Sequence, residues 1–247
     1  MIRPEDFFDP KNDIFDILFR DAEYVWEGLA NIRKCVEEIL TPNISGIRRN
    51  GSAVLEDTRL DNGALIHAGA FLEGGDIEIG AEAVVEPCAY IRGPALIGPG
   101  TEVRHGAYIR GNVLTGSGCV VGHTTEMKNS VMLHESKAGH FAYIGDSILG
   151  SVNLGAGTKL ANLKLVPSPV VLDIGDRKYE TGLKKFGAIM ADGVQTGCNS
   201  VTAPGTLLSR GTVIYPNTSA RGFYEAETVV KLRQNTESKK KEGVKDL

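Results

Sequence analysis

The stretch YIRGPALIGPGTEVRHGAYIRGNVLTG, residues 90–116, carries an aliphatic residue at nearly every sixth position. Ile91, Ile97, Val103 and Ile109 define the spacing. A period of six fits neither the ~3.6-residue period of a helix nor the alternation of a half-exposed strand. It is typical of a parallel β-helix, in which each hexapeptide forms one flat side of a triangular coil.

The six-residue spacing extends over most of the chain. One run reaches from Val85 to Leu133, and eight of its nine positions are aliphatic. The chain also has 30 glycines among 247 residues, above the usual ~7%, and glycine suits the tight corners between sides. Three sides make a coil of ~18 residues, and successive coils pair in parallel register. The sequence therefore predicts an all-β fold, a parallel β-helix of hexapeptide repeats. The predicted inward positions are Ile66, Leu72, Ile79, Val85, Ile91, Ile97, Val103, Ile109, Thr115, Val121, Met127 and Leu133, then a looser set of Ile144, Leu149, Leu154 and Leu160, then Met190, Thr196, Thr202, Leu208 and Ile214.

Composition limits the function before any motif does. The net charge of −4 argues against a nucleic-acid partner, because such proteins need a basic surface to neutralise phosphates. The sequence has no apolar run of ~18 residues to span a bilayer and does not open with a cationic stretch followed by an apolar run. We therefore expect a cytoplasmic protein without a membrane partner. The four cysteines form no CxxC pair, so the sequence indicates neither a metal site nor a disulfide framework.

Two segments escape the period. The N-terminal one shows helical spacing in VWEGLANIRKCVEEIL, with Leu29, Ile32 and Val36 on one face. We predict a helical cap over the open first coil, where strand edges would otherwise be unpaired; a helix that binds a partner is the alternative. The second segment is an excursion between coils, and such insertions tend to lie on the binding face. The predicted divisions are 1–45, the helical cap; 46–222, the β-helix with the insertion 161–188; and 223–247, a C-terminal helix or tail.

Charged and hydrogen-bonding residues that interrupt the pattern point to a site, because a coil needs only small and aliphatic residues. Each also has an ordinary interpretation. His140 fits a solvated corner residue, and Tyr143 fits a packed aromatic with its hydroxyl in water. Lys128 fits a surface ion pair with Glu126, worth well under ~1 kcal/mol. The interrupting residues are Arg104, Glu126, Lys128, His140, Tyr143, Asn153, Asn162, Lys184 and Lys185. The other histidines, His67, His105, His123 and His134, are interpreted as solvated background.

The order of these residues matches a known family. TEMKNSVMLHESKAGHFAYIGDSILGSVNLGAGTKLAN, residues 125–162, resembles the acetyltransferase domain of the bifunctional glucosamine-1-phosphate acetyltransferase/N-acetylglucosamine-1-phosphate uridyltransferase. That family carries E-x-K, then S-K-A-x-H-x-x-Y-x-G-D, then V-N-x-G-A-G-T and an Asn. TGLKKFGAIMADGVQTGCN, residues 181–199, is similar to archaeal sugar-1-phosphate nucleotidylyltransferases with the same domain. The resemblance covers roughly residues 90–218 and implies left-handed coiling, acetyl-CoA as cosubstrate, and a homotrimer whose sites are shared between neighbouring β-helices.

The resemblance also implies roles for single residues. His140 falls on the catalytic histidine, which takes a proton from the sugar amine, and an imidazole with an ordinary pKa near ~6.5 suits that task. Cationic and phenolic donors suit a phosphate, and a backbone N–H in the turn around Ala156 suits a developing oxyanion. The implied substrate-binding residues are Arg104, Glu126, Lys128, Tyr143, Asn153, Lys184 and Lys185. The implied coenzyme-binding residues are Ala156, Asn162 and Cys198.

The sequence departs from the family at several points. His123 stands where the family commonly has Asn, and Leu163 replaces a Tyr. No Gly-rich, basic nucleotide loop precedes the repeat, so uridylyl transfer is not expected. The resemblance predicts an acetyl-CoA-dependent N-acetyltransferase acting on an amino-sugar 1-phosphate, first of all glucosamine 1-phosphate. Two alternatives remain: acylation of another amine, such as a nucleotide-linked amino sugar, and a non-catalytic trimeric sugar-phosphate-binding or scaffold protein. A scaffold has no need of the combination of His140, Lys128 and Tyr143.

Overall fold

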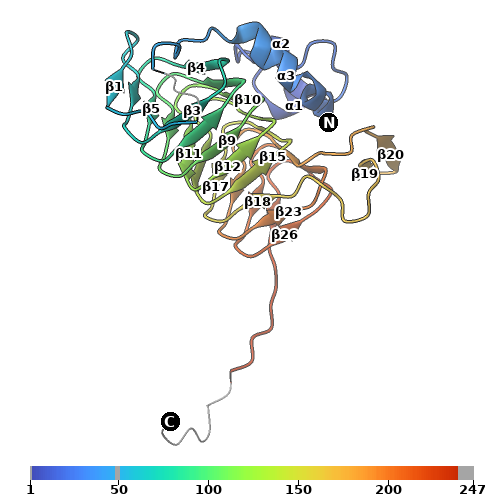
Figure 1. Ribbon diagram of the computed structural model, residues 1–247. Helices are drawn as coiled ribbons and strands as arrows, with labels where there is room; N and C mark the ends of the chain where they lie inside the picture. Colours follow the sequence, from blue (N-terminus) through green and yellow to red (C-terminus); the bar gives the residue numbers. More distant parts are fainter. Residues whose placement is uncertain (1, 48–50, 239–247) are drawn as a thin grey trace, which may run out of the picture.

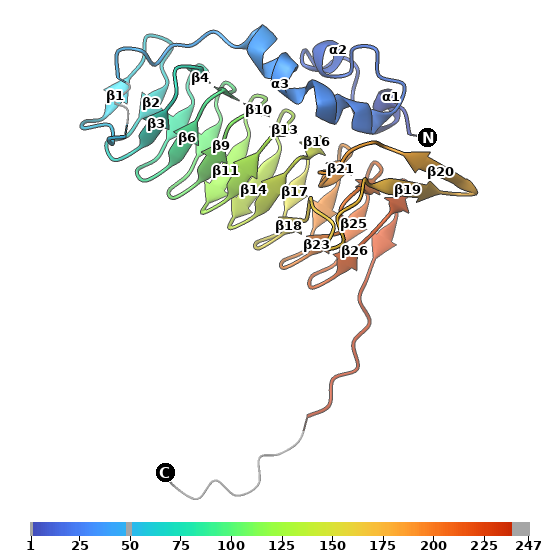
Figure 2. The same ribbon diagram turned by 45° about the vertical axis from the view of Figure 1, so that its right-hand side comes forward.

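The computed structural model describes residues 2–47 and 51–238, and its body is a stack of parallel coils (Figure 1, Figure 2). Strands of three sheets follow one another along the chain, and each sheet forms one side of the stack. Val85 pairs with Val103 and Ile91 with Ile109, so equivalent positions there are eighteen residues apart. The predicted parallel β-helix is confirmed, and its left-handed coiling stays a prediction.

We call the sheets side 1, side 2 and side 3, in the order in which the chain meets them within a coil. Side 1 consists of β1 (Thr58–Arg59), β2 (Leu65–Ile66), β5 (Val84–Val85), β8 (Glu102–Val103), β11 (Val120–His123), β14 (Lys137–His140), β17 (Asn153–Leu154), β22 (Gln195–Thr196), β25 (Val213–Ile214) and β28 (Val229–Val230). Side 2 consists of β3 (Phe71–Glu73), β6 (Tyr90–Arg92), β9 (Tyr108–Arg110), β12 (Glu126–Lys128), β15 (Tyr143–Gly145), β18 (Lys159–Leu160), β23 (Val201–Thr202) and β26 (Ser219–Ala220). Side 3 consists of β4 (Ile77–Ile79), β7 (Ala95–Ile97), β10 (Val113–Thr115), β13 (Ser130–Met132), β16 (Ile148–Leu149), β21 (Ala188–Met190), β24 (Thr206–Leu208) and β27 (Phe223–Tyr224).

The inward residues of successive coils stack into one core. On side 1, Val85, Val103 and Val121 are in register and fully buried. Burying an aliphatic side chain of this size contributes roughly 1.5–3 kcal/mol, and each inward residue packs on its equivalents in the coils above and below. The six-residue pattern of the sequence therefore marks the inside of the stack, except at Leu133. Met132 is in register with the inward Thr115 and Leu149 in its place, because this coil is seventeen residues long.

Side 3 is apolar on its outer face as well. The central residue of its strands points away from the axis, yet Leu114, Val131 and Ile148 are fully buried. An exposed apolar stripe running the length of a stack would be a strong aggregation surface, so side 3 needs a cover. The residues of this outer stripe, each in register with the next, are Leu96, Leu114, Val131, Ile148, Ile189, Leu207 and Phe223.

The N-terminal helices provide this cover (Figure 2). The longest helix, α3, begins beside Ile148, since a Cβ on Gly28 would lie 3.1 Å from its Cδ1. Just after the helix, the Asn43 side chain donates to the carbonyl oxygen of Ile79 on β4 at 2.8 Å. The twelve residues of α3 rise about 18 Å, which matches ~19 Å for the four strand spacings from β16 to β4. The helical elements are α1 (Pro4–Phe7), α2 (Phe15–Leu18), the 3₁₀ helix η1 (Val25–Glu27) and α3 (Gly28–Ile39).

The helices therefore do not lie where the sequence predicted, over the open end of the first coil. That end is closed by extended chain: β1 pairs antiparallel with β2, and Ala53 forms an antiparallel bridge with Phe71. The physical reason is that the helices bury more apolar surface on the outer stripe of side 3, which runs along many coils, than they would on the end of a single coil. Among the described residues, no helix has the length and apolar character needed to cross a membrane. The division of the chain at residues 45 and 46 stays a prediction.

Residues 161–187, which we call the ribbon, leave the stack after β18 and return at β21. Their outer half is an antiparallel pair, β19 (Val171–Ile174) and β20 (Arg177–Glu180). The C-terminal segment also differs from its prediction, because residues 223–230 continue the coils as β27 and β28 instead of leaving them. The reason is that Phe223 extends the outer stripe and Val230 pairs with Ile214 at an inward position. Residues 231–238 form no helix, and 239–247 lie outside the described residues.

Candidate active site

His140 ends β14 at the corner between sides 1 and 2, and its side chain is exposed. Phe141 turns this corner with a φ of +35°, an unusual conformation for a bulky residue. Hydrogen bonds hold the corner on both sides: Phe141 N–H donates to the carbonyl of His123 at 2.7 Å, and Gly157 N–H donates to that of His140 at 3.1 Å. The corresponding residues of the neighbouring coils, Thr124 and Gly157, also have positive φ, at +48° and +74°, so this conformation belongs to the corner of the fold.

Two more histidines stand in line with His140. His123 pairs in register with His140, and the rings of His105 and His123 stack with centroids 5.8 Å apart. His123 Nδ1 lies 3.0 Å from the carbonyl oxygen of His105. From the sequence alone, His105 and His123 are interpreted as ordinary solvated residues, and their alignment with His140 is not predicted. The signal that reveals it is their spacing of eighteen and seventeen residues, which is one coil each.

Side 2 presents a polar row next to this corner. Glu126 and Tyr143 are register partners on β12 and β15, and Arg110 Nη1 donates to Glu126 Oε1 at 2.6 Å. The Tyr143 hydroxyl donates to Asn162 Oδ1 at 3.4 Å. Burial raises the pKa of Tyr143, and the nearby carboxylates of Glu126 and Asp146 raise it further, so the phenol stays a neutral donor at physiological pH. Arg110 was not among the predicted site residues.

A buried carboxylate organises the far corner, between sides 2 and 3. Asp146 is 4% exposed and accepts hydrogen bonds from three side chains. Lys128 Nζ lies 3.2 Å from its Oδ2 and Asn129 Nδ2 lies 2.9 Å from its Oδ1, while Asn162 Nδ2 also donates to Oδ2. Lys128, predicted as a phosphate ligand, is therefore paired within the chain. Asp146 is the last residue of the quoted S-K-A-x-H-x-x-Y-x-G-D motif, which is the signal that could have identified it.

Of the remaining predicted residues, Arg104 and Asn153 lie away from both corners. Ala156 and Cys198 occupy the position equivalent to His140 in the next two coils, because Ala138, Leu154 and Thr196 pair in register two residues earlier. Arg104 and Asn153 lie on side 1, and Arg104 pairs with Glu102 at 2.7 Å. Lys184 and Lys185 are exposed at the base of the ribbon, where Lys185 bridges to Leu163 beside Asn162. Side 2 is three residues wide, or about 10 Å, so one narrow face separates the corners.

The turn around Ala156 offers one N–H group to a ligand. Gly155 N–H donates to the carbonyl of Thr196 at 2.8 Å, and Gly157 N–H donates to that of His140. Among the described residues, no backbone carbonyl accepts a hydrogen bond from Ala156 N–H. A backbone N–H at such a corner can donate to a developing oxyanion.

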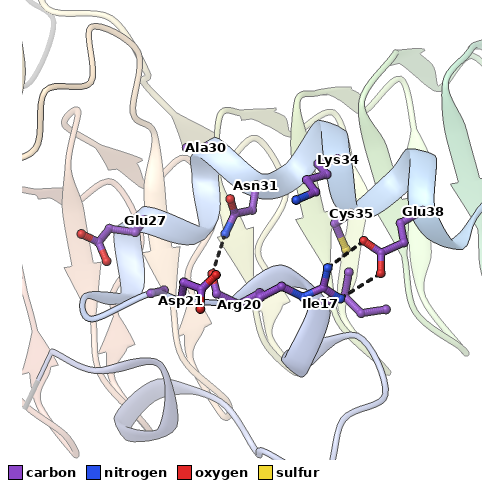
Figure 3. Close-up of a pocket in the computed structure, with 10 residues that line it drawn as sticks. Ile17, Arg20, Asp21, Glu27, Ala30, Asn31, Lys34, Cys35 and Glu38 are labelled. Carbon is purple, nitrogen blue, oxygen red and sulfur yellow. Dashed lines mark hydrogen bonds and ion pairs between the residues drawn. The ribbon is translucent and has the colours of Figure 1, made fainter.

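Three cavities lie elsewhere, and one of them, of about 550 Å³, is lined by Asp13, His134 and Asp192 among others. Another, of about 390 Å³, lies between α2 and α3 (Figure 3). Its Arg20 is already paired with Glu38 at 2.8 Å, and no predicted site residue lines it. A larger, mainly apolar cavity of about 690 Å³ lies between the ribbon and the last coils, lined by Leu163 and Phe223 among others. His140 lines none of these three cavities, and its side chain is exposed.

The cysteines provide a probe of the corner. Burial raises the pKa of Cys35 to about 12 and that of Cys119 to about 11, whereas Cys88 and Cys198 are exposed. Because thiolate and access govern reactivity, maleimide at roughly pH 8 is expected to label only the exposed pair. If acetyl-CoA binds at this corner, saturating coenzyme slows labelling of Cys198 about tenfold and leaves Cys88 unchanged. Equal labelling rates with and without coenzyme, followed by mass spectrometry, would contradict a coenzyme site at Cys198.

Comparison with known proteins connects this surface with a family. Residues 91–219 match the family model described as the GMPPB C-terminal domain. The bifunctional sugar-1-phosphate nucleotidylyltransferase/acetyltransferase of Sulfurisphaera tokodaii is 37% identical over 92 residues, which are 37% of this chain and 23% of that protein. The bifunctional protein GlmU of Albidiferax ferrireducens is 32% identical over 187 residues, which are 72% of this chain and 33% of that protein. The chain thus spans a quarter to a third of the length of these relatives.

Among solved structures, a hexapeptide transferase family protein from Anaplasma phagocytophilum gives a TM-score of 0.29 at 20% identity, covering 65% of this chain and 76% of that one. The fold assignment therefore rests on the strand pairings described above. The family match covers both corners and the polar row between them, together with the base of the ribbon.

Proposed function

The chain belongs to the family of GMPPB C-terminal domains, and from this membership we propose that it is an acetyl-CoA-dependent N-acetyltransferase of amino-sugar 1-phosphates, with glucosamine 1-phosphate as the first candidate. The observation that carries the proposal is the position of His140. Its exposed ring ends β14 at a corner, and Tyr143, the register partner of Glu126, follows three residues later in the chain. That corner also carries Ala156 and Cys198 at equivalent positions in the next coils.

The proposed chemistry is proton transfer coupled to acyl transfer. A ring nitrogen of His140 accepts a proton from the sugar amine as the amine nitrogen attacks the thioester carbonyl. The carbonyl oxygen becomes an oxyanion, to which Ala156 N–H donates. The C–S bond then breaks, the carbonyl re-forms as an amide, and the coenzyme leaves as a thiol after taking the proton from the imidazolium. Glu126 and Asn153 are proposed to orient the sugar ring.

Phosphate binding is assigned to the cations around side 2. Lys184 and Lys185 are exposed and have no salt bridge to any described residue. Lys128 is paired with Asp146, and Arg104 is paired with Glu102. Each cation can therefore donate to a phosphate only if it also keeps its hydrogen bond to the carboxylate. Tyr143 adds a neutral phenol donor. We therefore propose that Lys185 is the principal phosphate ligand.

Replacing Lys185 with alanine is expected to raise the KM for the sugar phosphate about 10- to 100-fold, since a hydrogen bond to a charged group contributes ~1.5–3 kcal/mol. The kcat is expected to stay within about threefold, because Lys185 does not handle the reacting proton. Lys178→Ala, at an exposed position on β20, is the matched control. A KM that is the same in both variants would remove Lys185 from the phosphate site.

We also propose that the active unit is a homotrimer in which a neighbouring copy completes the open surface at His140. Mixing two impaired variants tests this. If His140 and Lys185 that serve one site come from different copies, unfolding and refolding His140→Ala together with Lys185→Ala restores activity, because some interfaces hold both native residues. If activity stays at the sum of the separate variants while native mass spectrometry of copies with different tags shows mixed trimers, the site lies within one chain.

A second candidate substrate class is favoured by the aromatic row on side 2. Tyr90 and Tyr108 lie in register with Glu126, with their ring centroids 5.5 Å apart. Tyr108 is 39% exposed, and the Arg110 guanidinium lies 5.6 Å from its ring centroid. Exposed aromatic faces next to a guanidinium can stack a nucleobase and hold phosphates. This arrangement favours a nucleotide-linked amino sugar as the alternative acceptor.

One assay distinguishes these candidates. Purified protein is incubated with acetyl-CoA and glucosamine 1-phosphate, glucosamine 6-phosphate, or UDP- and dTDP-linked amino sugars, and CoA release is measured. Turnover with the 1-phosphate supports the leading proposal. Preference for a nucleotide-linked sugar, lost in Tyr108→Ala, supports the second candidate. Failure of all acceptors would overturn the enzymatic proposal and favour a binding or scaffold role.

A further inference from the structure

The ribbon places Lys184 and Lys185 between two anchors. At its base, Phe186 N–H donates to the carbonyl of Asn162 at 2.9 Å, and the Phe186 ring is fully buried. At its outer half, Tyr179 on β20 packs edge-on against Tyr24 and Trp26, with centroid distances of 5.4 Å and 5.5 Å. The two lysines lie in the short stretch between these contacts, so both anchors limit where their side chains can reach.

The outer anchor belongs to the N-terminal segment. Trp26 lies on η1, is 4% exposed, and stacks on Tyr24 with centroids 4.8 Å apart and planes 3° apart. An isolated two-stranded ribbon is marginally stable in water, so its position depends on what it packs against. Here it packs against the same segment that covers side 3 (Figure 2). We call Tyr24, Trp26 and Tyr179 the aromatic clamp.

The other leg of the ribbon is largely exposed at its start. Leu163 is 57% exposed, Leu165 102% and Val166 76%. By contrast, Val170 and Leu172 are buried and pack over Gly205, where an added Cβ would lie 2.5 Å and 2.9 Å from their side chains. The leg that carries the lysines is therefore held at the clamp and at the base, and also by the other leg, where Val170 N–H donates to the carbonyl of Leu183 at 2.8 Å and Leu163 forms a bridge with Lys185.

We propose that the aromatic clamp positions Lys184 and Lys185 for the substrate phosphate, so that the N-terminal segment sets substrate affinity from outside the site. The inference rests on the proposed function for its kinetic part and on geometry alone for its structural part. Tyr179, Tyr24 and Trp26 are positioning residues, because they act through the ribbon and touch none of the proposed reacting groups.

The chain offers a direct test, because Trp26 is its only tryptophan. Tyr179→Ala is expected to shift Trp26 emission to longer wavelength and to increase its quenching by acrylamide. It is also expected to raise the KM for the sugar phosphate about 3- to 10-fold, the range that corresponds to loss of an aromatic pair. The kcat is expected to stay within about twofold. Tyr179→Phe keeps the ring and is the matched control; all three readouts are expected to match the native protein.

A structural readout keeps the clamp testable if the function proposal fails. In the native protein, trypsin is expected to cleave slowly after Lys184 and Lys185, and Tyr179→Ala is expected to accelerate these cuts while the melting temperature of the coils is retained. Unchanged Trp26 emission together with unchanged cleavage would overturn the clamp. Changed emission and cleavage with an unchanged KM would overturn its role in substrate affinity. If native protein turns over no amino sugar, the function proposal fails, and the clamp is decided by fluorescence and proteolysis alone.

Discussion

Replacing His140 with alanine is expected to lower kcat at least about a hundredfold, because a positioned general base contributes ~10²–10⁴-fold. CoA release in the presence of saturating sugar phosphate measures the loss. The melting temperature is expected to change little, since the ring is exposed at the end of β14. The KM for the sugar phosphate is expected to remain close to native, because the imidazole handles the amine and not the phosphate.

His105→Ala is the matched control for this experiment. His105 is also an exposed corner histidine, two coils before His140, and it stacks on the intervening His123. We expect its removal to leave kcat within about threefold. An equal loss of kcat in both variants would show that the aligned residues His105, His123 and His140 act by packing rather than by proton transfer. A native rate in His140→Ala would end the role of His140 as the base.

Replacing Gly122 with alanine is expected to be the most damaging small substitution near the site. An added Cβ would overlap the carbonyl oxygen of Gly139 in the next coil and lie 2.5 Å from that of Ala138. Both obstacles are backbone, so the coils must separate, and overpacking of this kind costs about 3 kcal/mol or more. For a chain of this size, that corresponds to a drop in Tm of roughly 6–12 °C.

Gly139→Ala provides the comparison, because Gly139 lies at the equivalent position one coil later, and a Cβ added there would meet no atom within 4 Å. Its Tm is expected to stay within about 2 °C of native. Differential scanning calorimetry measures the Tm of both variants. The difference between the two Tm values gives the effect of the clash with the next coil, separately from the general effect of replacing a glycine by alanine. Similar Tm values in both variants would contradict the stacking distances between β11 and β14.

The sequence was sufficient to predict the coils because one physical rule repeats over long runs, with Thr115 the exception in the longest of them. An inward aliphatic residue at every sixth position identifies the axis, as Ile91, Ile97 and Val103 do. The same reasoning did not place the helices, because it considered only inward positions. The overlooked signal is that strands of side 3 are apolar at two neighbouring positions, as in Leu114 beside Val113 and Ile148 beside Leu149.

The sequence nominates residues for the proposed site, but it does not predict how they are arranged. The motif around His140 predicts a site at that corner, yet it does not indicate that Lys128 is paired with Asp146 or that Glu126 is paired with Arg110. Each of those pairings joins residues in neighbouring coils. Which residues become neighbours depends on the number of residues in each corner. A single motif read along the chain contains no information about neighbours across coils.

The N-terminal segment also changes how the whole stack responds to stress. Coiled repeats normally contact only the next repeat and can unravel from either end. Here Arg210 donates to the carbonyl of Asp6 at 3.1 Å, and Asp192 N–H donates to that of Phe7 at 3.1 Å, while Asn43 reaches β4 at the opposite end. The N-terminal segment thus connects early coils with late ones. We therefore expect the coils to unfold together, and local unfolding at one end of the stack to destabilise the other end.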